Sequence, residues 1–410
     1  YTHTCNNSIT IPSFFSNRYR DEKKMLQVIA AIFIVIFFIP YTASGFAACG
    51  KLFSSLFGVN YLTAMIISAI VIVAYTTLGG FLAASTTDFI QSIIMSVALI
   101  VVLIFGVETA GGIGAVIHNA SELPGYLSMT LSYDVNTGKA APYNALTIVS
   151  TAAWGLGYFG MPHILLRFMA IEDEKKLKLS RRVATIWVVI SLFVAVFIGV
   201  IGYTMSKVGA LEMLTGSNSE TIIVKISALL SQHGVIFALL AGVILAGILA
   251  STMSTSDSQL LAASSAVSSD ILGAFRKDSS NKNGSMAAAR ITLLVISVVA
   301  AFIARNPDSS VFAIVSFAWA GFGAAFGPVV LFSLFWKRTN KWGALAGMVC
   351  GGSMVFIWKY LIRPLGGIWN IYELLPAFLI ACAAIVIVSL LTPKPSKEIE
   401  EEFDRVAQMK

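Results

Sequence analysis

Long runs of apolar residues, separated by short polar segments, recur along the whole chain. Ten of these runs approach or exceed the roughly 20 residues that an α-helix needs to cross the hydrocarbon core of a bilayer. Glycine and proline lie inside several runs without ending the hydrophobic pattern, which is frequent in transmembrane helices. The pattern predicts ten membrane spans, over residues 26–50, 60–80, 88–107, 145–169, 184–205, 234–264, 288–304, 311–336, 342–361 and 372–392.

The composition agrees with a membrane protein and excludes an ordinary soluble domain. Of the 410 residues, 57% are hydrophobic and 12% are charged, with a mean hydropathy of +0.82. A soluble domain carries about 25% charged residues. The four cysteines are scattered and no C-x-x-C or H-E-x-x-H motif occurs, so the sequence gives no support for a disulfide framework or a metalloenzyme.

The net charge of +7 follows the predicted topology and does not indicate nucleic-acid binding. With a cytoplasmic N-terminus, 21 of the 28 lysines and arginines lie in inside segments and 7 in outside segments. This asymmetry satisfies the positive-inside rule with both ends of the chain in the cytoplasm. We expect a multi-pass protein of the cell membrane.

One transmembrane domain is expected over residues 1–392, because no linker separates folded modules. Residues 393–410 form a charged tail that we expect to be a solvated cytoplasmic helix or coil. Two longer outside segments, about 108–144 and 207–232, predict surface helices. The polar start of the chain lacks a signal peptide and is typical of an internal loop, so we expect the chain to be truncated at its N-terminus.

The span 145–169 contains the sequence WGLGYFGMPH and predicts a broken helix. Three glycines weaken the helix and a proline removes a backbone donor near its middle; these are Gly155, Gly157, Gly160 and Pro162. Broken helices in secondary transporters expose backbone groups that bind solute or ion. Trp154 and Tyr158, spaced i and i+4, share one face and are candidates for the wall of a solute pocket. Lipid anchoring and ordinary helix packing are the alternatives for this pair.

The span 234–264 carries a stripe of hydroxyl side chains at positions i, i+3, i+4 and i+7, namely Ser251, Ser254, Thr255 and Ser258. Neutral oxygens suit a monovalent cation that must leave again, so the stripe predicts a sodium site. The alternative is close helix packing, with hydroxyls bonded to the preceding turn. Asp257 favours the cation, because an uncompensated carboxylate at membrane depth costs on the order of 2.5 to 3.5 kcal/mol.

Three further positions are candidates with two interpretations each. Asp88 begins a span and either caps that helix or lies on the exit route of the ion. Tyr41, next to a proline in the first span, either reaches the same cavity or packs. The glycine-rich segment from Trp319 to Trp336 is interpreted as scaffold and possible gate.

Several long blocks closely resemble the sodium:solute symporter family, and within it the branch that carries sodium and proline. The blocks are YTASGFAACGKLF, GGFLAASTTDFIQS, WGLGYFGMPHILLRFMA, MSTSDSQLLAASSA and WAGFGAAFGPVVLFSLFWKRTNKWGALAGM. The likeness runs along essentially the whole chain. Branches that carry pantothenate, sugars and other solutes share the broader pattern.

The resemblance implies an all-α, leucine-transporter-like fold of two inverted five-helix repeats that works by alternating access. Ser254 and Thr255 would give sodium their hydroxyl oxygens, and Ser251 its backbone carbonyl. Tyr41, Trp154 and Tyr158 would contact proline.

The resemblance also implies roles for three positions near the ion and for a missing part of the family fold. Asp88 would lie at the sodium-linked gate, and Asp257 and Ser258 at an ion route or a second cation site. The first three of the family's thirteen membrane helices, including the first core helix, would precede this chain. We therefore expect the chain as it stands to lack competent transport.

The predicted function is sodium-coupled import of L-proline across a bacterial plasma membrane. Sodium is the coupling ion, and no other cofactor, nucleic acid or obligatory protein partner is expected beyond the membrane lipid. A sodium symporter for another small solute is the alternative. A passive channel would need a repeated ring of pore residues, and an intramembrane enzyme would need a nucleophile with a base. His163 and His233 are single histidines without partners in the sequence, so proton relay is a minor alternative.

Overall fold

The computed structural model describes residues 1–2, 7–171, 173–275 and 282–408 of the chain. Its α-helices are α1 (Ile11–Arg18), α2 (Met25–Phe57), α3 (Tyr61–Thr109), α4 (Ile113–Ser121), α5 (Ala145–Ala152), α6 (Pro162–Met169), α7 (Leu177–Lys207), α8 (Ile222–Ser231), α9 (Val235–Ser265), α10 (Leu272–Phe275), α11 (Lys282–Ile303), α12 (Val311–Phe335), α13 (Lys341–Ile357), α14 (Leu374–Leu391) and α15 (Lys397–Gln408). The 3-10 turns are η1 (Ala153–Phe159), η2 (Glu174–Lys176), η3 (Gly216–Thr221), η6 (Arg363–Leu365) and η7 (Gly367–Trp369), and the π turns are η4 (Ala266–Ile271) and η5 (Trp358–Ile362). Two short strands, β1 (Leu131–Asp134) and β2 (Lys139–Pro142), form an antiparallel hairpin.

Nine helical segments within the described residues are long and apolar enough to cross a membrane. They are Met25–Phe57, Tyr61–Leu78, Ser85–Thr109, Leu177–Lys207, Val235–Phe275, Met286–Ile303, Val311–Phe335, Lys341–Leu365 and Leu374–Leu391. The protein is therefore a helical, multi-pass membrane protein, as the hydropathy pattern predicts.

The difference between ten predicted spans and nine observed ones lies at 145–169. There the chain forms α5, η1 and α6 in succession, and the apolar helix Ala145–Phe159 is too short to count as a span. A second difference concerns the spans 60–80 and 88–107, which belong to the single helix α3 in the structure.

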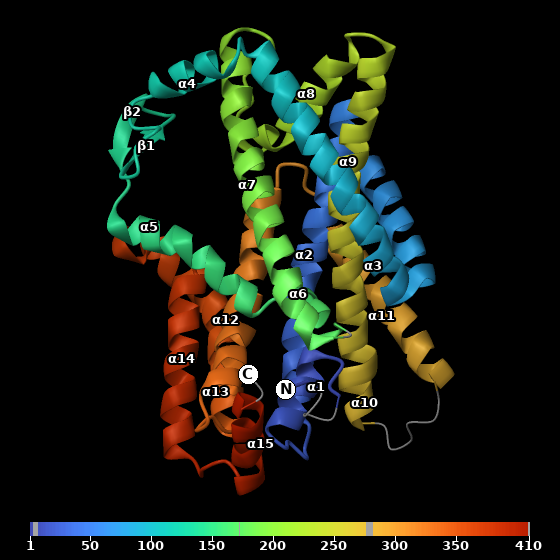
Figure 1. The fold of residues 1–410 in the computed structure, drawn as a ribbon, viewed down its shortest axis with the longest axis vertical. Helices are drawn as coiled ribbons and strands as arrows, with labels where there is room; N and C mark the ends of the chain where they lie inside the picture. The colour runs from blue at the N-terminus through green and yellow to red at the C-terminus, as the bar shows by residue number, and fades with distance from the viewer. Residues whose placement is uncertain (3–6, 172, 276–281, 409–410) are drawn as a thin grey trace.

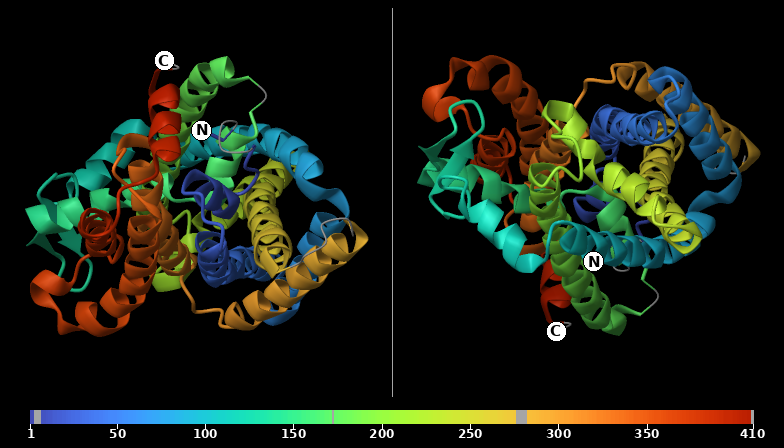
Figure 2. Two further views of the ribbon diagram at one scale, coloured as in Figure 1. Left: turned by 90° about the horizontal axis from the view of Figure 1, so that it is seen from below. Right: turned by 90° about the horizontal axis from the view of Figure 1, so that it is seen from above.

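The helices form an elongated bundle in which the two marked chain ends lie at the same end of the molecule (Figure 1). We call the end that holds α1, α10 and α15 the terminal face, and the opposite end, with α4, η3 and α8, the far face. The views along the bundle show α2 surrounded by other helices (Figure 2). This central helix, Met25–Phe57, contacts α3, α9, α11 and α12.

Two clusters of buried apolar side chains hold the bundle together. The larger one joins α1 and α2 to α12, α13 and α14, with residues such as Phe37, Phe322 and Phe326 fully buried. The smaller one joins the later part of α3 to α7, α8 and the first half of α9. The larger cluster therefore fixes α12 against α2, and α12 is the surface on which the broken segment rests.

The described part of the charged tail is a docked helix and not a freely solvated one. Glu402 of α15 is 1% exposed, and it accepts a hydrogen bond of 2.5 Å from Arg20, in the turn between α1 and α2. Ile399 is also buried. Lys337, after α12, pairs with Asp404 at 2.5 Å. The tail thus ties the end of the chain to its beginning.

The outside segment 108–144 contains the predicted surface helix as α4, together with the β1–β2 hairpin, which the sequence analysis did not predict. The segment 207–232 contains η3 and α8.

The break at 153–161 is possible because glycines let two backbones meet. A Cβ atom on Gly160 would lie 2.2 Å from the carbonyl oxygen of Phe322 and 2.8 Å from the amide nitrogen of Gly327. A Cβ atom on Gly323 would lie 2.8 Å from the Cα atom of Gly157. The segment therefore packs on α12 at a distance that only glycine allows.

We predict that Gly160→Ala lowers the stability of the protein by about 1–3 kcal/mol, because neither backbone can move aside for the new methyl group. Gly155→Ala is the matched control, because a Cβ atom there would meet nothing within 4 Å. Thermal unfolding in detergent measures both variants. Equal apparent melting temperatures for the two variants would contradict the proposed contact.

Candidate functional site

The predicted break separates η1 from α6 and leaves backbone groups without helical partners. Pro162 occupies the first turn of α6, where its missing donor is not needed, and Met161 before it is extended. The carbonyl of Trp154 accepts a hydrogen bond of 2.9 Å from the indole Nε1 of Trp319, on α12. A side chain of α12 thus satisfies one backbone group of the broken segment, as a hydrocarbon surrounding requires.

Trp154 lies in a stack of aromatic rings. Its ring is within 12–19° of parallel to the rings of Phe312, Trp319 and Tyr372, with centroid distances of 5.4, 5.5 and 5.8 Å. Tyr158 meets Trp319 edge-on at 4.9 Å. The two predicted solute residues of this segment are thus linked through Trp319, and three neighbouring rings cover Trp154.

Tyr41 comes from a different helix and lies within electrostatic range of Tyr158. It is on α2, is 8% exposed, and its ring centroid is 6.0 Å from that of His163 on α6. Among the ring contacts of the described residues, none joins Tyr41 to Trp154 or Tyr158.

Three oxygens of the hydroxyl stripe converge on one turn of α9. The hydroxyls of Ser254 and Thr255 each donate to the carbonyl of Ser251, both at 3.1 Å. Within the part of the chain that the structure describes, these are the only hydrogen bonds of the two hydroxyls. The geometry brings one carbonyl oxygen and two hydroxyl oxygens together. The same two hydrogen bonds are also the ones expected if the hydroxyls only bond to the preceding turn of the helix.

The end of the stripe nearest the terminal face contacts α6, the helix that follows the break. Ser258 accepts a hydrogen bond of 2.9 Å from the Nη2 atom of Arg167 on α6, and the same nitrogen pairs with the carboxylate of Asp88 on α3. The second oxygen of Asp88, Oδ1, is buried and has no partner among the described residues. One network of polar contacts therefore joins α3, α6 and α9, through Asp88, Arg167 and Ser258.

Asp257, the residue before Ser258 on α9, binds a different residue of α3. Its side chain is fully buried, and its Oδ2 atom accepts from the hydroxyl of Tyr75, on the first part of α3, at 2.9 Å. Its Oδ1 atom is buried without a partner in the described residues. Its charge still acts on Asp88, so the two carboxylates are neighbours.

A cavity of about 680 Å³ lies between the stripe and the terminal face. His163, Arg167 and Ser258 line its inner part, while Thr10 and Ser268 line it near the terminal face. Solute-sized space is thus present on the terminal side of the broken segment.

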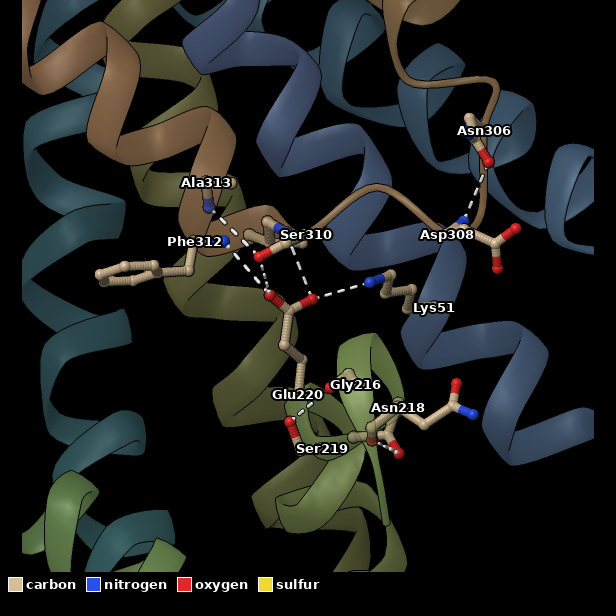
Figure 3. Close-up of polar contacts among 12 residues, drawn as sticks. Lys51, Gly216, Asn218, Ser219, Glu220, Asn306, Asp308, Ser310, Phe312 and Ala313 are labelled. Atoms are coloured by element: carbon tan, nitrogen blue, oxygen red, sulfur yellow. Dashed lines mark hydrogen bonds and ion pairs between the residues drawn. The ribbon is translucent and has the colours of Figure 1, made fainter. Parts of the chain in front are cut away.

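At the far face, one carboxylate joins three elements (Figure 3). Glu220 of η3 binds Lys51 of α2 at 2.7 Å and accepts from the hydroxyl of Ser310 at 2.9 Å. The backbone amides of Val311 and Phe312 also donate to it, each at 3.2 Å, so Glu220 caps α12 at its positive end. We call Glu220, Lys51 and Ser310 the far-face latch.

Partial burial acts to raise the pKa of Glu220, but the bonds from Lys51, Ser310 and the two amides together lower it below the ordinary value of 4.5. A carboxylate with a lowered pKa in the folded state contributes stability above its unfolded pKa. It loses that contribution only as the pH falls through the lowered value. Glu220 is therefore ionised throughout the neutral pH range.

Four contributors to these sites were not singled out in the sequence. Arg167 counted only as an inside charge, Trp319 was assigned to scaffold, and Tyr75 and Glu220 were not considered. For Arg167 a signal existed, since it lies one turn after His163 on the helix that follows the break. Glu220 and Tyr75 find their partners over long sequence separations, for which one sequence holds no signal.

Comparison with known proteins places these features in a family. The model of the sodium:solute symporter family matches residues 2–351. The high-affinity proline transporter PutP of Bacillus subtilis is 39% identical over 98% of this chain and 81% of its own length. The osmoregulated proline transporter OpuE of the same organism is 38% identical over 97% and 77%. The sodium/proline symporter of Escherichia coli is 37% identical over 98% and 77%.

A solved structure supports the fold independently. The substrate-bound, outward-open structure of a Na⁺-coupled sialic acid symporter matches with a TM-score of 0.72, covering 95% of this chain and 78% of that one. Its sequence identity of 16% restricts this comparison to the fold, which is the leucine-transporter-like fold of a sodium-coupled symporter. Together with the family match along most of the sequence, this assigns the chain to the sodium:solute symporter family.

Proposed function

We propose that the transporter imports L-proline into a bacterial cell, driven by sodium and by alternating access. The observation that carries this proposal is the 37–39% identity, over nearly the whole chain, to relatives named as proline transporters or sodium/proline symporters. In addition to the sodium gradient, the membrane potential contributes roughly 2.3 kcal/mol per charge for every 100 mV.

The carbonyl of Ser251 and the hydroxyls of Ser254 and Thr255 form the proposed sodium site. Their convergence on one turn of α9 supports it, because these are the neutral oxygen ligands that a hard monovalent cation accepts. Water or further protein oxygens would complete the shell. Sodium binding would replace the two intrahelical hydrogen bonds.

We propose that the terminal face is cytoplasmic, which agrees with the excess of lysine and arginine at that side. The structure then corresponds to an inward-facing state, with the 680 Å³ cavity leading inward and the far-face latch closed. Trp154 and Tyr158 would contact proline once the aromatic stack opens, and Tyr41 would contact it from α2.

Asp88 and Ser258 are the proposed exit route for sodium. Arg167 neutralises Asp88 in this state, so a passing ion would displace the guanidinium. Asp257, with a buried oxygen that lacks a partner in the described residues, is a proposed second cation site on the Tyr75 side of α9.

The first prediction concerns coupling. In proteoliposomes that contain the full-length gene product, uptake of radiolabelled proline should require an inward sodium gradient and should respond to membrane potential. Uptake of the same rate in sodium-free buffer would reject sodium coupling. Sodium-dependent uptake of another solute in preference to proline would retain the coupling and reject the assigned solute.

The second prediction concerns the sodium site. Ser254→Ala and Thr255→Ala should each raise the sodium concentration for half-maximal uptake, by about threefold to tenfold for the loss of one oxygen ligand. Thr252→Ala is the matched control, because its hydroxyl donates to the carbonyl of Ile248 on another face of α9. Unchanged sodium dependence in a Ser254→Ala, Thr255→Ala double variant would reject the site.

The third prediction concerns the far-face latch. Glu220→Gln removes an ion pair and weakens the cap of α12, at about 1–3 kcal/mol, so it should favour far-face opening. The labelling rate of a cysteine at the buried position Ala153 should then rise about tenfold with a thiol reagent applied from that side. Glu212→Gln, which breaks the more exposed pair of Glu212 with Lys225, should leave the rate unchanged. Equal labelling rates in Glu220→Gln and Glu212→Gln would contradict a role of the far-face latch in opening.

A further inference from the structure

A second carboxylate, far from the proposed sodium site, lies at the terminal end of the same helix line. Asp270 is in the π turn η4, which continues α9, and it is 2% exposed. Its Oδ1 atom accepts from the hydroxyl of Thr10 at 2.8 Å and from the amide of Gln27 at 3.0 Å. Three elements, α2, η4 and the cap of α1, therefore meet at this one side chain.

Within the described residues, no charged group compensates Asp270. Both of its hydrogen-bond donors are neutral, and none of the ion pairs among the described residues includes it. Its Oδ2 atom is buried and has no hydrogen-bond partner in the described chain. A buried carboxylate in this state requires a cation or a proton.

A line of hydroxyl groups leads from the stripe to this carboxylate. Ser258, Ser265, Ser268 and Ser269 lie along the helix line and line the same cavity, and Thr10 lines it too. The twelve residues from Ser258 to Asp270 span about 18 Å of helix. The direct neighbours of Asp270 in sequence and in space thus face the space that an ion released from α9 would enter.

The three polar side chains can act as an oxygen ligand set. Asp270 offers its free Oδ2 atom, and the hydroxyl of Thr10 has lone pairs. The amide of Gln27 presents its oxygen after a flip of its terminal group. A π turn within a helix is frequent at functional sites, and here it sets the position of Asp270.

We propose that Asp270, Thr10 and Gln27 form a separate sodium site at the cytoplasmic end of the exit route. An ion that leaves Ser254 and Thr255 rests there before it enters the cytoplasm, and cytoplasmic sodium refills the site and slows the return of the empty transporter. This inference rests on the proposed function, because it requires sodium as the coupling ion and a cytoplasmic terminal face.

The test uses right-side-out vesicles from cells that express the full-length gene product. It measures proline uptake at fixed external sodium and potential, with increasing sodium chloride trapped inside. Choline chloride at equal concentration corrects for ionic strength. In the wild type, internal sodium should inhibit uptake. In Asp270→Asn the inhibitory concentration should rise by at least about tenfold, while the external sodium for half-maximal uptake changes by less than about twofold.

Gln27→Lys provides an independent variant, because it places a tethered ammonium beside Asp270 in the position of the ion. It should remove inhibition by internal sodium in the same way, and it decides the question if Asp270→Asn fails to fold. Asp21→Asn is the matched control. Asp21 is a buried carboxylate at the same face, bonded to the backbone amide of Leu26 at 2.8 Å, and its loss should leave the internal sodium dependence unchanged.

Wild-type inhibition by internal sodium in Gln27→Lys would overturn the proposal. It would also be overturned if Asp270→Asn altered the dependence on internal pH and not on internal sodium, since the carboxylate would then hold a proton. A wild type that needs no external sodium is a different outcome: it rejects the proposed function itself, whatever the Asp270 variants do.

Discussion

The need to satisfy backbone groups inside the membrane is the constraint on which this structure depends. A helix that breaks in hydrocarbon leaves amides and carbonyls without partners, and each would be costly. Here the break lies against α12, where Gly157 and Gly160 meet the backbone of α12 and Trp319 bonds to the carbonyl of Trp154. The non-helical segment is stable because a neighbour supplies both the space and the donor.

The far-face latch binds the first turn of the same helix, α12. Its first residues are capped by Glu220, and Phe312 in its first turn covers Trp154. Movement at the start of α12 would therefore disturb the far-face latch and the aromatic stack together. In this geometry, the residue that bonds to Glu220 and the ring that covers Trp154 are the same, namely Phe312.

Features determined by local sequence could be predicted, and features determined by distant contacts could not. The spans follow from hydropathy, and the break follows from Gly157, Gly160 and Pro162, because these act on their own backbone. The convergence of Ser251, Ser254 and Thr255 follows from helical spacing. In contrast, Trp319 and Glu220 acquire their roles from partners in other elements, which one sequence does not reveal.

Two predictions about charged residues were incomplete, because they did not include the partners of those residues. The partner of Asp257 was not predicted, because its hydrogen bond comes from Tyr75, 182 positions away along the chain. The tail contains many charges, which is typical of a solvated segment, yet Glu402 is buried and bonds to Arg20. A hydropathy pattern counts charges and does not indicate which of them meet.

The docked tail has a consequence for biosynthesis. Arg20 and Glu402 are separated by 382 positions, so the α1–α2 turn lacks its final partner until the last residues leave the ribosome. A product that ends before α15 would contain every membrane helix of this chain, but its Arg20 would lose both carboxylate partners, Glu398 and Glu402. Arg20 would keep its hydrogen bond to the carbonyl of Asn17.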